Sequence, residues 1–180
     1  PMEHTRLLLN SMGCEACRPA YRDVVKTHLY DHKDEMCDEC MRRAEINPLR
    51  AFDCKNERCS CVMADAPKIT EYLCDDCKAH YNQVKSYLDI AGLTYVEDPT
   101  LVRGLDYYTR TVFEVQVTEG MGSQNAIGGG GRYDKLAEEV GGRPTPGFGW
   151  ALGYERCVLA LEAAGVTMEP LAGPQVFAAC

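Results

Sequence analysis

The sequence lacks the long apolar runs, the basic excess and the low-complexity tracts that mark several large classes of protein. No apolar run approaches the roughly 18 residues of a membrane span, and no signal peptide opens the chain. Acidic residues outnumber basic ones by 27 to 19, so no global positive field favours nucleic-acid binding. A small basic groove would still be compatible with this balance. We therefore expect a cytoplasmic, globular protein without membrane association.

The regular alternation of strand and helix that is typical of a parallel sheet is also missing. Strand signals occur at 1–11, 93–98 and 110–118, and in the last of these Thr111 and Phe113 alternate with Val112 and Glu114. The following segments predict a glycine turn that opens a short helix (127–142), and a glycine-spaced strand that leads into a helix (147–165). Strands followed by helices without βαβ alternation predict an antiparallel α+β architecture.

Cysteine, in contrast, is abundant. The chain has 11 cysteines, and nine of them lie between residues 14 and 77. Without a secretion signal, metal binding explains them better than a disulfide framework. The same region has helical patterns, and we expect helices beginning at Pro19, over 37–45, and from about Asp75 to a stop at Gly92.

The cysteines form three Cys-x-x-Cys pairs with three further cysteines between the second and third pair. A two-residue gap lets two thiolates reach one tetrahedral metal ion. The 19 residues between Cys17 and Cys37 fit a zinc pattern, so we predict one four-cysteine zinc site from the first two pairs. That site would comprise Cys14, Cys17, Cys37 and Cys40, and a second would comprise Cys54, Cys59, Cys74 and Cys77.

Two alternatives remain open for these cysteines. Cys61 competes with Cys59 for the fourth place in the second site. The pairs could also be redox-active or simply reduced thiols, although a redox pair is expected at a strand end in a thioredoxin-like unit, which the pattern does not show. Closed four-cysteine sites are structural, because no coordination position remains for water or substrate.

Three segments carry a resemblance to a known family. The strings "LVRGLDYYTRTVFE", "GGRYDKL" and "GFGWALGYER" occur in that order from residue 101 onward. The first two resemble the histidine-specific segments of histidyl-tRNA synthetase, and the third resembles motif 3 of class II aminoacyl-tRNA synthetases. "NPLRAFDCKN" and "DAPKITEYL" are similar to the insertion of the bacterial members.

The resemblance implies a two-step reaction that makes histidyl-adenylate from histidine and ATP and then transfers histidine to tRNA(His). It assigns catalytic roles at the phosphates to Arg103 and Arg156, with Mg²⁺ sharing the charge, and adds Gly153 to the ATP site. It assigns the histidine pocket to the side chains of three tyrosines and to the backbone of a glycine run. The tyrosines are Tyr107, Tyr108 and Tyr133. The glycines are Gly130 and Gly131, which belong to the glycine run 128–131.

Each of these residues also has a simpler interpretation. A run of four glycines is most often a flexible turn, paired tyrosines are most often packing residues, and an exposed arginine is usually a solvated charge. The occurrence of all three strings in this order favours the histidyl-tRNA synthetase family over these simpler interpretations. Tyr107 and Tyr108, as neighbours in an extended chain, would face opposite sides, so one shared pocket requires an irregular strand entrance, which Gly104 is expected to supply.

The resemblance also divides the chain and suggests partners. We expect a core strand (1–11), a Cys-rich helical insertion domain (12–91), the C-terminal half of a class II catalytic core (92–170) and the start of a linker or a truncated anticodon-binding domain (171–180). Motifs 1 and 2 would precede residue 1, so the chain is expected to be an inactive piece of a homodimeric enzyme.

Two other functions remain open. One is the non-catalytic regulatory subunit of ATP phosphoribosyltransferase, which shares the fold. The other is a zinc module that binds nucleic acid, although residues 1–90 hold 13 basic against 16 acidic residues. In a milder form of the second alternative, the insertion touches the tRNA acceptor stem through Arg42, Arg43 and Arg50.

Overall fold

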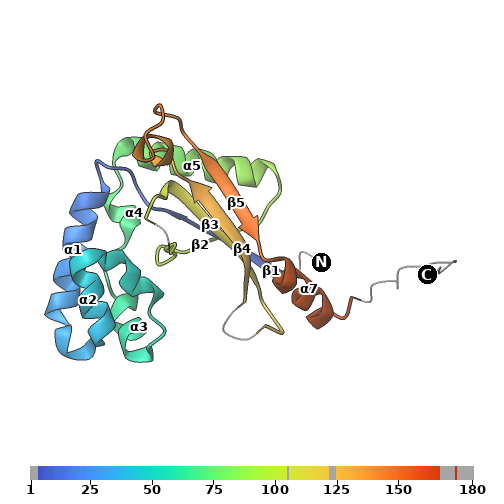
Figure 1. Ribbon diagram of the computed structural model, residues 1–180, viewed down its shortest axis with the longest axis horizontal. Coiled ribbons are helices and arrows are strands. Elements are labelled where there is room, and N and C mark those ends of the chain that lie inside the picture. Colours follow the sequence, from blue (N-terminus) through green and yellow to red (C-terminus); the bar gives the residue numbers. More distant parts are fainter. Residues whose placement is uncertain (1–3, 105, 122–124, 167–172, 174–180) are drawn as a thin grey trace, which may run out of the picture.

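The computed structural model describes residues 4–104, 106–121, 125–166 and 173, and its centre is a five-stranded sheet. The strand order is β2-β1-β3-β4-β5, in which β1 and β2 are parallel and all other neighbours are antiparallel (Figure 1). The strands are β1 (Thr5–Ser11), β2 (Val96–Glu97), β3 (Thr109–Val117), β4 (Ala126–Arg132) and β5 (Phe148–Leu152). The predicted α+β class is confirmed.

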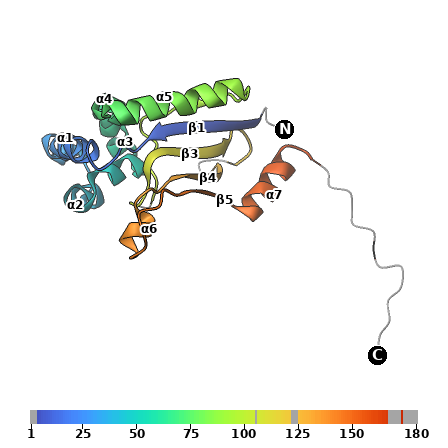
Figure 2. The same ribbon diagram turned by 90° about the horizontal axis from the view of Figure 1, so that it is seen from above.

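Most of the helices precede β2 in the chain and gather beside one end of the sheet, while α5 runs along it (Figures 1 and 2). They are α1 (Arg18–Asp31), α2 (Asp38–Ile46), α3 (Glu57–Ala64), α4 (Ile69–Tyr72) and α5 (Asp75–Ile90), with short 3-10 turns η2 (Lys33–Glu35) and η3 (Pro48–Asp53). Two further helices lie later in the chain: α6 (Leu136–Glu139) follows β4, and α7 (Tyr154–Ala163) follows β5. The three helices expected between residues 19 and 92 are confirmed.

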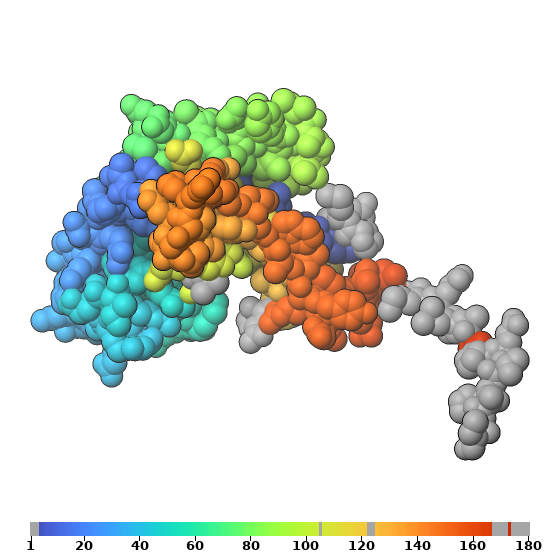
Figure 3. All heavy atoms as spheres, turned by 45° about the horizontal axis from the view of Figure 1, so that its top comes forward, coloured from blue at the N-terminus to red at the C-terminus, as the bar shows by residue number. Residues whose placement is uncertain are grey.

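Two separate groups of buried side chains hold these elements together. In the helical part, α1 buries Tyr21, Val25 and Leu29, which lie four residues apart and therefore on one face of the helix. In the sheet, Leu8, Leu101, Tyr108 and Val112 form a smaller cluster against which Tyr107 and Tyr133 pack. The space-filling view shows the blue-to-cyan helices in contact with the green α5 segment, and α7 standing apart from them (Figure 3).

Helix α5 joins the two groups. Its Tyr81 hydroxyl donates to the carbonyl oxygen of Leu9 at 3.3 Å, and the Nε2 atom of His80 lies 3.1 Å from the Thr111 hydroxyl. Leu7, Leu9, Thr111 and Phe113 all face a shallow apolar cavity beneath this helix. The alternation expected in β3 is therefore confirmed, since Thr111 and Phe113 face α5 while Val112 faces the other side.

The glycine run is the main departure from the predicted fold. Gly128–Gly131 do not form a turn but lie inside β4, between β3 and β5. A Cβ atom on Gly130 would lie 2.1 Å from the Gly149 carbonyl oxygen, and one on Gly131 would lie 2.5 Å from that of Thr111. Glycine is required here because the neighbouring strands approach too closely for any side chain. The strand predicted over 93–98 is also shorter and forms only at Val96–Glu97.

The entrance to β3 is irregular, as the shared tyrosine pocket requires. Asp106 and Tyr107 lie in a turn, the pairing of β3 with β4 shifts between Thr109 and Val112, and Arg110 has a positive φ of 51°. Gly104 lies in a bend, in line with the expectation, but it has no positive φ; the positive φ occurs at Arg110, beyond the turn. The strand start predicted near the end of the chain lies outside the described residues.

Candidate functional site

An open cavity of about 700 Å³ lies on the face of the sheet that is opposite α5. It is formed by the segment before β3, by the three strands β3, β4 and β5, and by the first turn of α7. The predicted residues that line it are Arg103, Tyr107, Tyr108, Tyr133, Gly153 and Arg156. Six side chains or backbone positions that are spread over 54 residues of sequence thus meet at one surface.

Arg103 is held in this cavity by an ion pair. Its Nη1 atom donates to Glu114 Oε2 at 2.7 Å, and the two side chains are only 24% and 18% exposed. Glu114 is in turn fixed by Gln116, whose Nε2 atom donates to Oε1 at 2.9 Å. The Nε atom of Arg103 is buried and has no hydrogen-bond partner among the described residues. The guanidinium is therefore oriented by the protein, and its exposed part lines the cavity, where it can donate to an anionic ligand.

The three tyrosines form a compact aromatic group beside Arg103. The ring centroids of Tyr107 and Tyr108 are 4.7 Å apart, and the Tyr133 ring meets Tyr107 edge to face at 5.7 Å. Burial, followed by the hydrogen bond that Tyr107 donates to Tyr108, raises the pKa of Tyr107. A phenol can donate a hydrogen bond to a ligand or accept one from it.

Tyr133 depends on two glycines of the "GFGW" string. A Cβ atom on Gly147 would lie 2.4 Å from the Tyr133 ring, and one on Gly149 would lie 2.3 Å from its hydroxyl oxygen. The Tyr133 amide also donates to the Gly147 carbonyl oxygen at 2.9 Å. These glycines therefore allow the ring to lie flat against the backbone leading into β5.

Arg156 approaches the cavity from α7. Its Nη1 atom donates to the Ala126 carbonyl oxygen at 3.1 Å, which ties the first turn of the helix to the start of β4. A Cβ atom on Gly153 would lie 3.2 Å from Arg156 Cδ, so the helix cap leaves room for the arginine stem. Arg103 and Arg156 thus enter one cavity from different elements.

Two predicted positions fall elsewhere, and one residue was missed. Gly130 and Gly131 do not line the cavity; Gly128 and Gly129 do. The unpredicted residue is Glu114, for which the alternation in β3 contained a signal, because it placed Glu114 on the same face as Val112.

The cysteines meet in two sets, each of four sulfur atoms within 4.8 Å of one another. The sets are Cys14, Cys17, Cys74 and Cys77, here called the first cluster, and Cys37, Cys40, Cys54 and Cys59, the second cluster. The eight predicted residues therefore converge, but the predicted division is wrong. Cys59 and not Cys61 joins the second cluster, and Cys61 is exposed.

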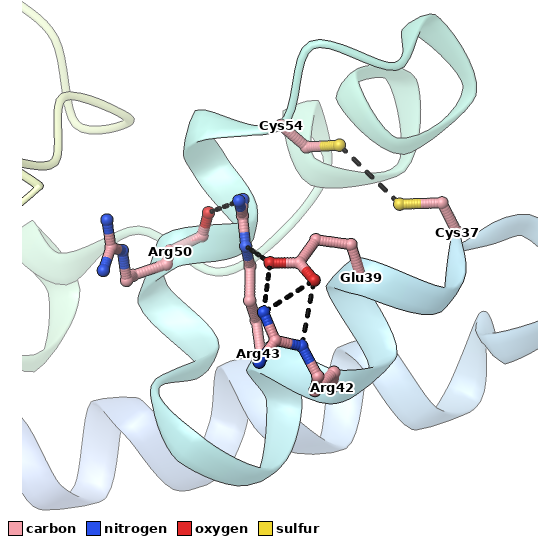
Figure 4. Close-up of polar contacts among 6 residues, drawn as sticks. All are labelled: Cys37, Glu39, Arg42, Arg43, Arg50 and Cys54. Carbon is pink, nitrogen blue, oxygen red and sulfur yellow. Dashed lines mark hydrogen bonds and ion pairs between the residues drawn. The ribbon is translucent and has the colours of Figure 1, made fainter.

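The cause of the regrouping is the anchoring of α5. The first pair follows β1 in the chain and the third pair opens α5, and Tyr81 of α5 is bonded to Leu9 of β1. This contact brings the third pair to the first. The second pair opens α2 and meets Cys54, which precedes α3, and Cys59, which lies within α3. Cys37 Sγ is 3.9 Å from Cys54 Sγ (Figure 4).

The donor geometry of both clusters fits a tetrahedral metal ion. With zinc–sulfur bonds of about 2.3 Å, sulfur atoms in a tetrahedron are about 3.8 Å apart. The Cys14 sulfur lies 3.7 Å from those of Cys17 and Cys74, and the Cys17 sulfur lies 3.9 Å from that of Cys77.

The protonation of the thiols differs within each cluster. Burial opposes ionisation of Cys14, but hydrogen bonds from the Ala16 and Cys17 amides and from neighbouring thiols lower its pKa to about 7. The Cys40 amide in the same way lowers the pKa of Cys37 to about 7, whereas burial raises the pKa of Cys40 and Cys77. One thiol in each cluster therefore has a lowered pKa, which favours the thiolate that binds a cation.

A family model described as histidyl-tRNA synthetase matches residues 16–157. The chain belongs to the histidyl-tRNA synthetase family. It is 48% identical over 178 residues to the histidine–tRNA ligase of Caldanaerobacter subterraneus subsp. tengcongensis. It is 51% identical over 162 residues to the histidine–tRNA ligase of Halothermothrix orenii. The crystal structure of apo histidyl-tRNA synthetase from S. aureus superimposes with a TM-score of 0.70 at 38% identity.

The histidyl-tRNA synthetase relatives are longer than this chain. The matches cover 99% and 90% of the chain but 42% and 38% of the two bacterial ligases, and 93% of the chain but 40% of the S. aureus structure. Both relatives are named as histidine–tRNA ligases, and Arg103 and Arg156 line one cavity, so the synthetase interpretation is favoured over the regulatory subunit. No helix among the described residues is long and apolar enough to cross a membrane.

Proposed function

We propose that this chain forms part of a histidine–tRNA ligase, in which it supplies the histidine pocket and two of the arginines that bind ATP phosphates. The full enzyme would join histidine to AMP, release pyrophosphate, and pass the histidyl group to the terminal ribose of tRNA(His). The observation that carries the proposal is the convergence of Arg103, Arg156 and three tyrosines on one cavity.

In the first step, a carboxylate oxygen of histidine forms a bond to the α-phosphorus of ATP while the bond to the pyrophosphate oxygen breaks. Negative charge grows on the α-phosphate oxygens during this exchange, and a cation already aimed at them stabilises the transition state. We assign this role to Arg103, which an ion pair with Glu114 already orients. Arg156 is assigned to the terminal phosphates, with Gly153 leaving room beside it.

The amino acid specificity would come from the tyrosine group. A neutral imidazole has one nitrogen that donates and one that accepts a hydrogen bond, and a phenol can satisfy either. A pocket built of such groups rejects side chains that leave its phenols unpaired. Tyr108 and Tyr133 are proposed as the direct contacts, and the described backbone of Gly128 and Gly129 replaces that of Gly130 and Gly131 at the cavity wall.

Mg²⁺ is proposed to arrive with ATP as part of the substrate. Among the described residues that line the cavity, Glu114 offers the one carboxylate, and it is already bonded to Arg103 and Gln116. The described residues that line the cavity therefore do not fit a direct magnesium site.

Both cysteine clusters are proposed to hold structural zinc. The spacing of the four sulfur atoms in each fits the tetrahedral ion, and a closed set of four thiolates leaves no position for substrate. The domain division proposed from the sequence, with 12–91 as an insertion, agrees with a block that metal binding helps to fold.

The partners proposed for the full protein are tRNA(His) and a second copy of itself. Of the three arginines considered for tRNA contact, Arg42 and Arg43 both donate to Glu39, at 2.9 and 3.0 Å. The Arg50 guanidinium points away from this group (Figure 4). Arg50 is therefore the strongest candidate among the three, because its charge is not neutralised by Glu39.

The decisive experiment is histidine-dependent exchange of pyrophosphate into ATP by the full-length protein. We expect exchange with histidine and not with other amino acids, and a fall of roughly 10²–10³-fold in Arg103→Ala, as when one preorganised donor is removed. The 180-residue chain by itself is expected to be inactive. Absence of histidine-dependent exchange in the full-length protein would overturn the proposal.

A further inference from the structure

Arg18 connects the first cysteine cluster to the tyrosines, although sequence patterns give it no role. Its guanidinium donates to four backbone carbonyl oxygens, at 3.0 Å to Met12, at 3.4 Å to Gly13 and Asp106, and at short range to Tyr108. Two of these acceptors follow β1 and two belong to the turn that carries Tyr107 and Tyr108. One side chain thus fastens two segments that are about 90 residues apart.

The position of Arg18 is itself set by the first cluster. Arg18 directly follows Cys17, and its amide donates to the Cys14 carbonyl oxygen at 2.9 Å, which closes the turn between the two cysteines. Because α1 begins at this turn, the position of the Arg18 guanidinium depends on the position of the Cys14–Cys17 turn.

A second contact joins the same two segments through the backbone. The Arg110 amide donates to the Gly13 carbonyl oxygen at 2.8 Å, and the Met12 amide donates to the Arg110 carbonyl oxygen at 2.5 Å. Arg110 is the residue with the positive φ at the irregular entrance to β3. The turn of the first cluster thus packs on the same irregularity that brings Tyr107 and Tyr108 to one pocket.

We propose that Arg18 is a positioning residue for histidine recognition, because it transmits the geometry of the first cysteine cluster to the backbone beneath Tyr107 and Tyr108. The proposal rests on the proposed function, in which these tyrosines bind histidine. Arg18 does not line the cavity, so it acts only through the carbonyl oxygens of Asp106 and Tyr108. Its effect should therefore fall on histidine binding and not on ATP binding.

A lysine cannot replace this arginine. The planar guanidinium donates in several fixed directions at once, whereas an ammonium is a compact charge on a flexible stem. Arg18→Lys thus keeps the charge and loses the four-carbonyl arrangement, and Arg18→Ala removes both. Arg22 provides a matched control, because it lies one turn further along α1 and its Nη2 atom donates at 2.8 Å to the Ile46 carbonyl oxygen, an acceptor that belongs to α2 and not to the tyrosine turn.

The test measures histidine-dependent pyrophosphate exchange by the full-length enzyme carrying Arg18→Lys, Arg18→Ala or Arg22→Ala. Both Arg18 variants should raise the KM for histidine roughly 10- to 100-fold, as expected for the loss of hydrogen bonds to a charged donor, with the KM for ATP within about twofold of wild type. Arg22→Ala should leave both constants unchanged. Added methylguanidine should lower the histidine KM of Arg18→Ala and leave that of Arg22→Ala unaltered.

Several outcomes would overturn the proposal. An unchanged histidine KM in Arg18→Lys would do so, as would an equal rise in both KM values or an absence of rescue by methylguanidine in a folded Arg18→Ala. If Arg18→Ala does not fold, Arg18→Lys decides alone. These outcomes are distinct from failure of the proposed function, in which the wild-type enzyme itself would show no histidine-dependent exchange.

Discussion

The ion pair between Arg103 and Glu114 can be tested apart from the arginine itself. Replacing Glu114 by alanine leaves the Arg103 charge in place but removes the carboxylate that aims it, 2.7 Å from Nη1. Glu114→Gln is the milder change, because an amide oxygen can still accept from Arg103 while the negative charge is lost. Comparing the two variants therefore separates the effect of orienting Arg103 from the effect of the negative charge on Glu114.

The size of the effect follows from the contact. A hydrogen bond to a charged group contributes about 1.5–3 kcal/mol when it is sheltered from water. Arg103 and Glu114 are 24% and 18% exposed, so partial screening by solvent places the value in the lower half of that range. If this orientation is needed only in the transition state, Glu114→Ala slows adenylate formation by roughly 10- to 50-fold, and Glu114→Gln by less than about tenfold.

Single-turnover formation of histidyl-adenylate in the full-length enzyme measures this step directly. Gln116→Ala is the matched control, because it removes the 2.9 Å bond to Glu114 Oε1 and leaves the bond between Glu114 and Arg103 intact. We expect the control to stay within about threefold of wild type. A rate in folded Glu114→Ala equal to that of wild type would refute the idea that Glu114 orients Arg103 for catalysis.

Three further changes test other parts of the structure. Gly129→Ala would place a methyl group 2.9 Å from Arg103 Nη1 and 2.7 Å from a β3 carbonyl oxygen, so we expect lower activity and a loss of about 1–3 kcal/mol of stability in thermal unfolding. Cys74→Ser and Cys54→Ser each disrupt one cluster, so elemental analysis should find one zinc fewer per chain in either variant. Only Cys74→Ser should also raise the histidine KM, and an equal rise in both variants would contradict the regrouped clusters. Arg50→Ala should raise the KM for tRNA and leave pyrophosphate exchange unchanged; an unaltered aminoacylation rate at low tRNA would remove it as a contact.

Much of the site could be predicted because its residues occur in short, ordered strings. Arg103, Tyr107 and Tyr108 lie in one string, and the strand alternation after them is confirmed by the structure. The requirement for an irregular strand entrance also followed from simple geometry, since neighbouring residues of a regular strand face opposite sides. The source of the irregularity was not predictable, because a positive φ at a non-glycine residue such as Arg110 depends on its tertiary contacts.

The cysteine clusters show where sequence spacing stops being informative. A Cys-x-x-Cys pair defines how its own two thiols lie, but which pairs meet is decided by packing far along the chain. Here the hydrogen bond from Tyr81 to the Leu9 carbonyl anchors α5 on β1 and carries Cys74 and Cys77 to the first pair. A match to the 19-residue spacing between Cys17 and Cys37 held no information about that contact.

The glycine run was misplaced for a related reason. Local propensity favours a turn for four consecutive glycines, because each loses more backbone freedom in a strand than any other residue. The structure shows that three neighbouring features need the missing Cβ atoms at once. The backbones of β3 and β5 press on β4 from either side, and Arg103 crosses Gly129. The need for glycine at these positions arises from β3, β5 and Arg103 together, so it could not be predicted from the sequence of β4 alone.

These contacts together show how a cysteine-rich helical block can support the cavity beside it. The cavity is open, Tyr107 and Tyr108 precede β3, and Tyr133 follows β4, so none of the three belongs to a strand. The four-glycine strand beneath them has little side-chain packing of its own. Rigidity must therefore come from neighbours. Glu114 supplies it for Arg103, and the first cluster supplies it for Tyr107 and Tyr108 through Arg18. A metal-bound turn suits the second task, because its geometry is set by covalent-strength bonds to sulfur and not by the marginal packing of a small core.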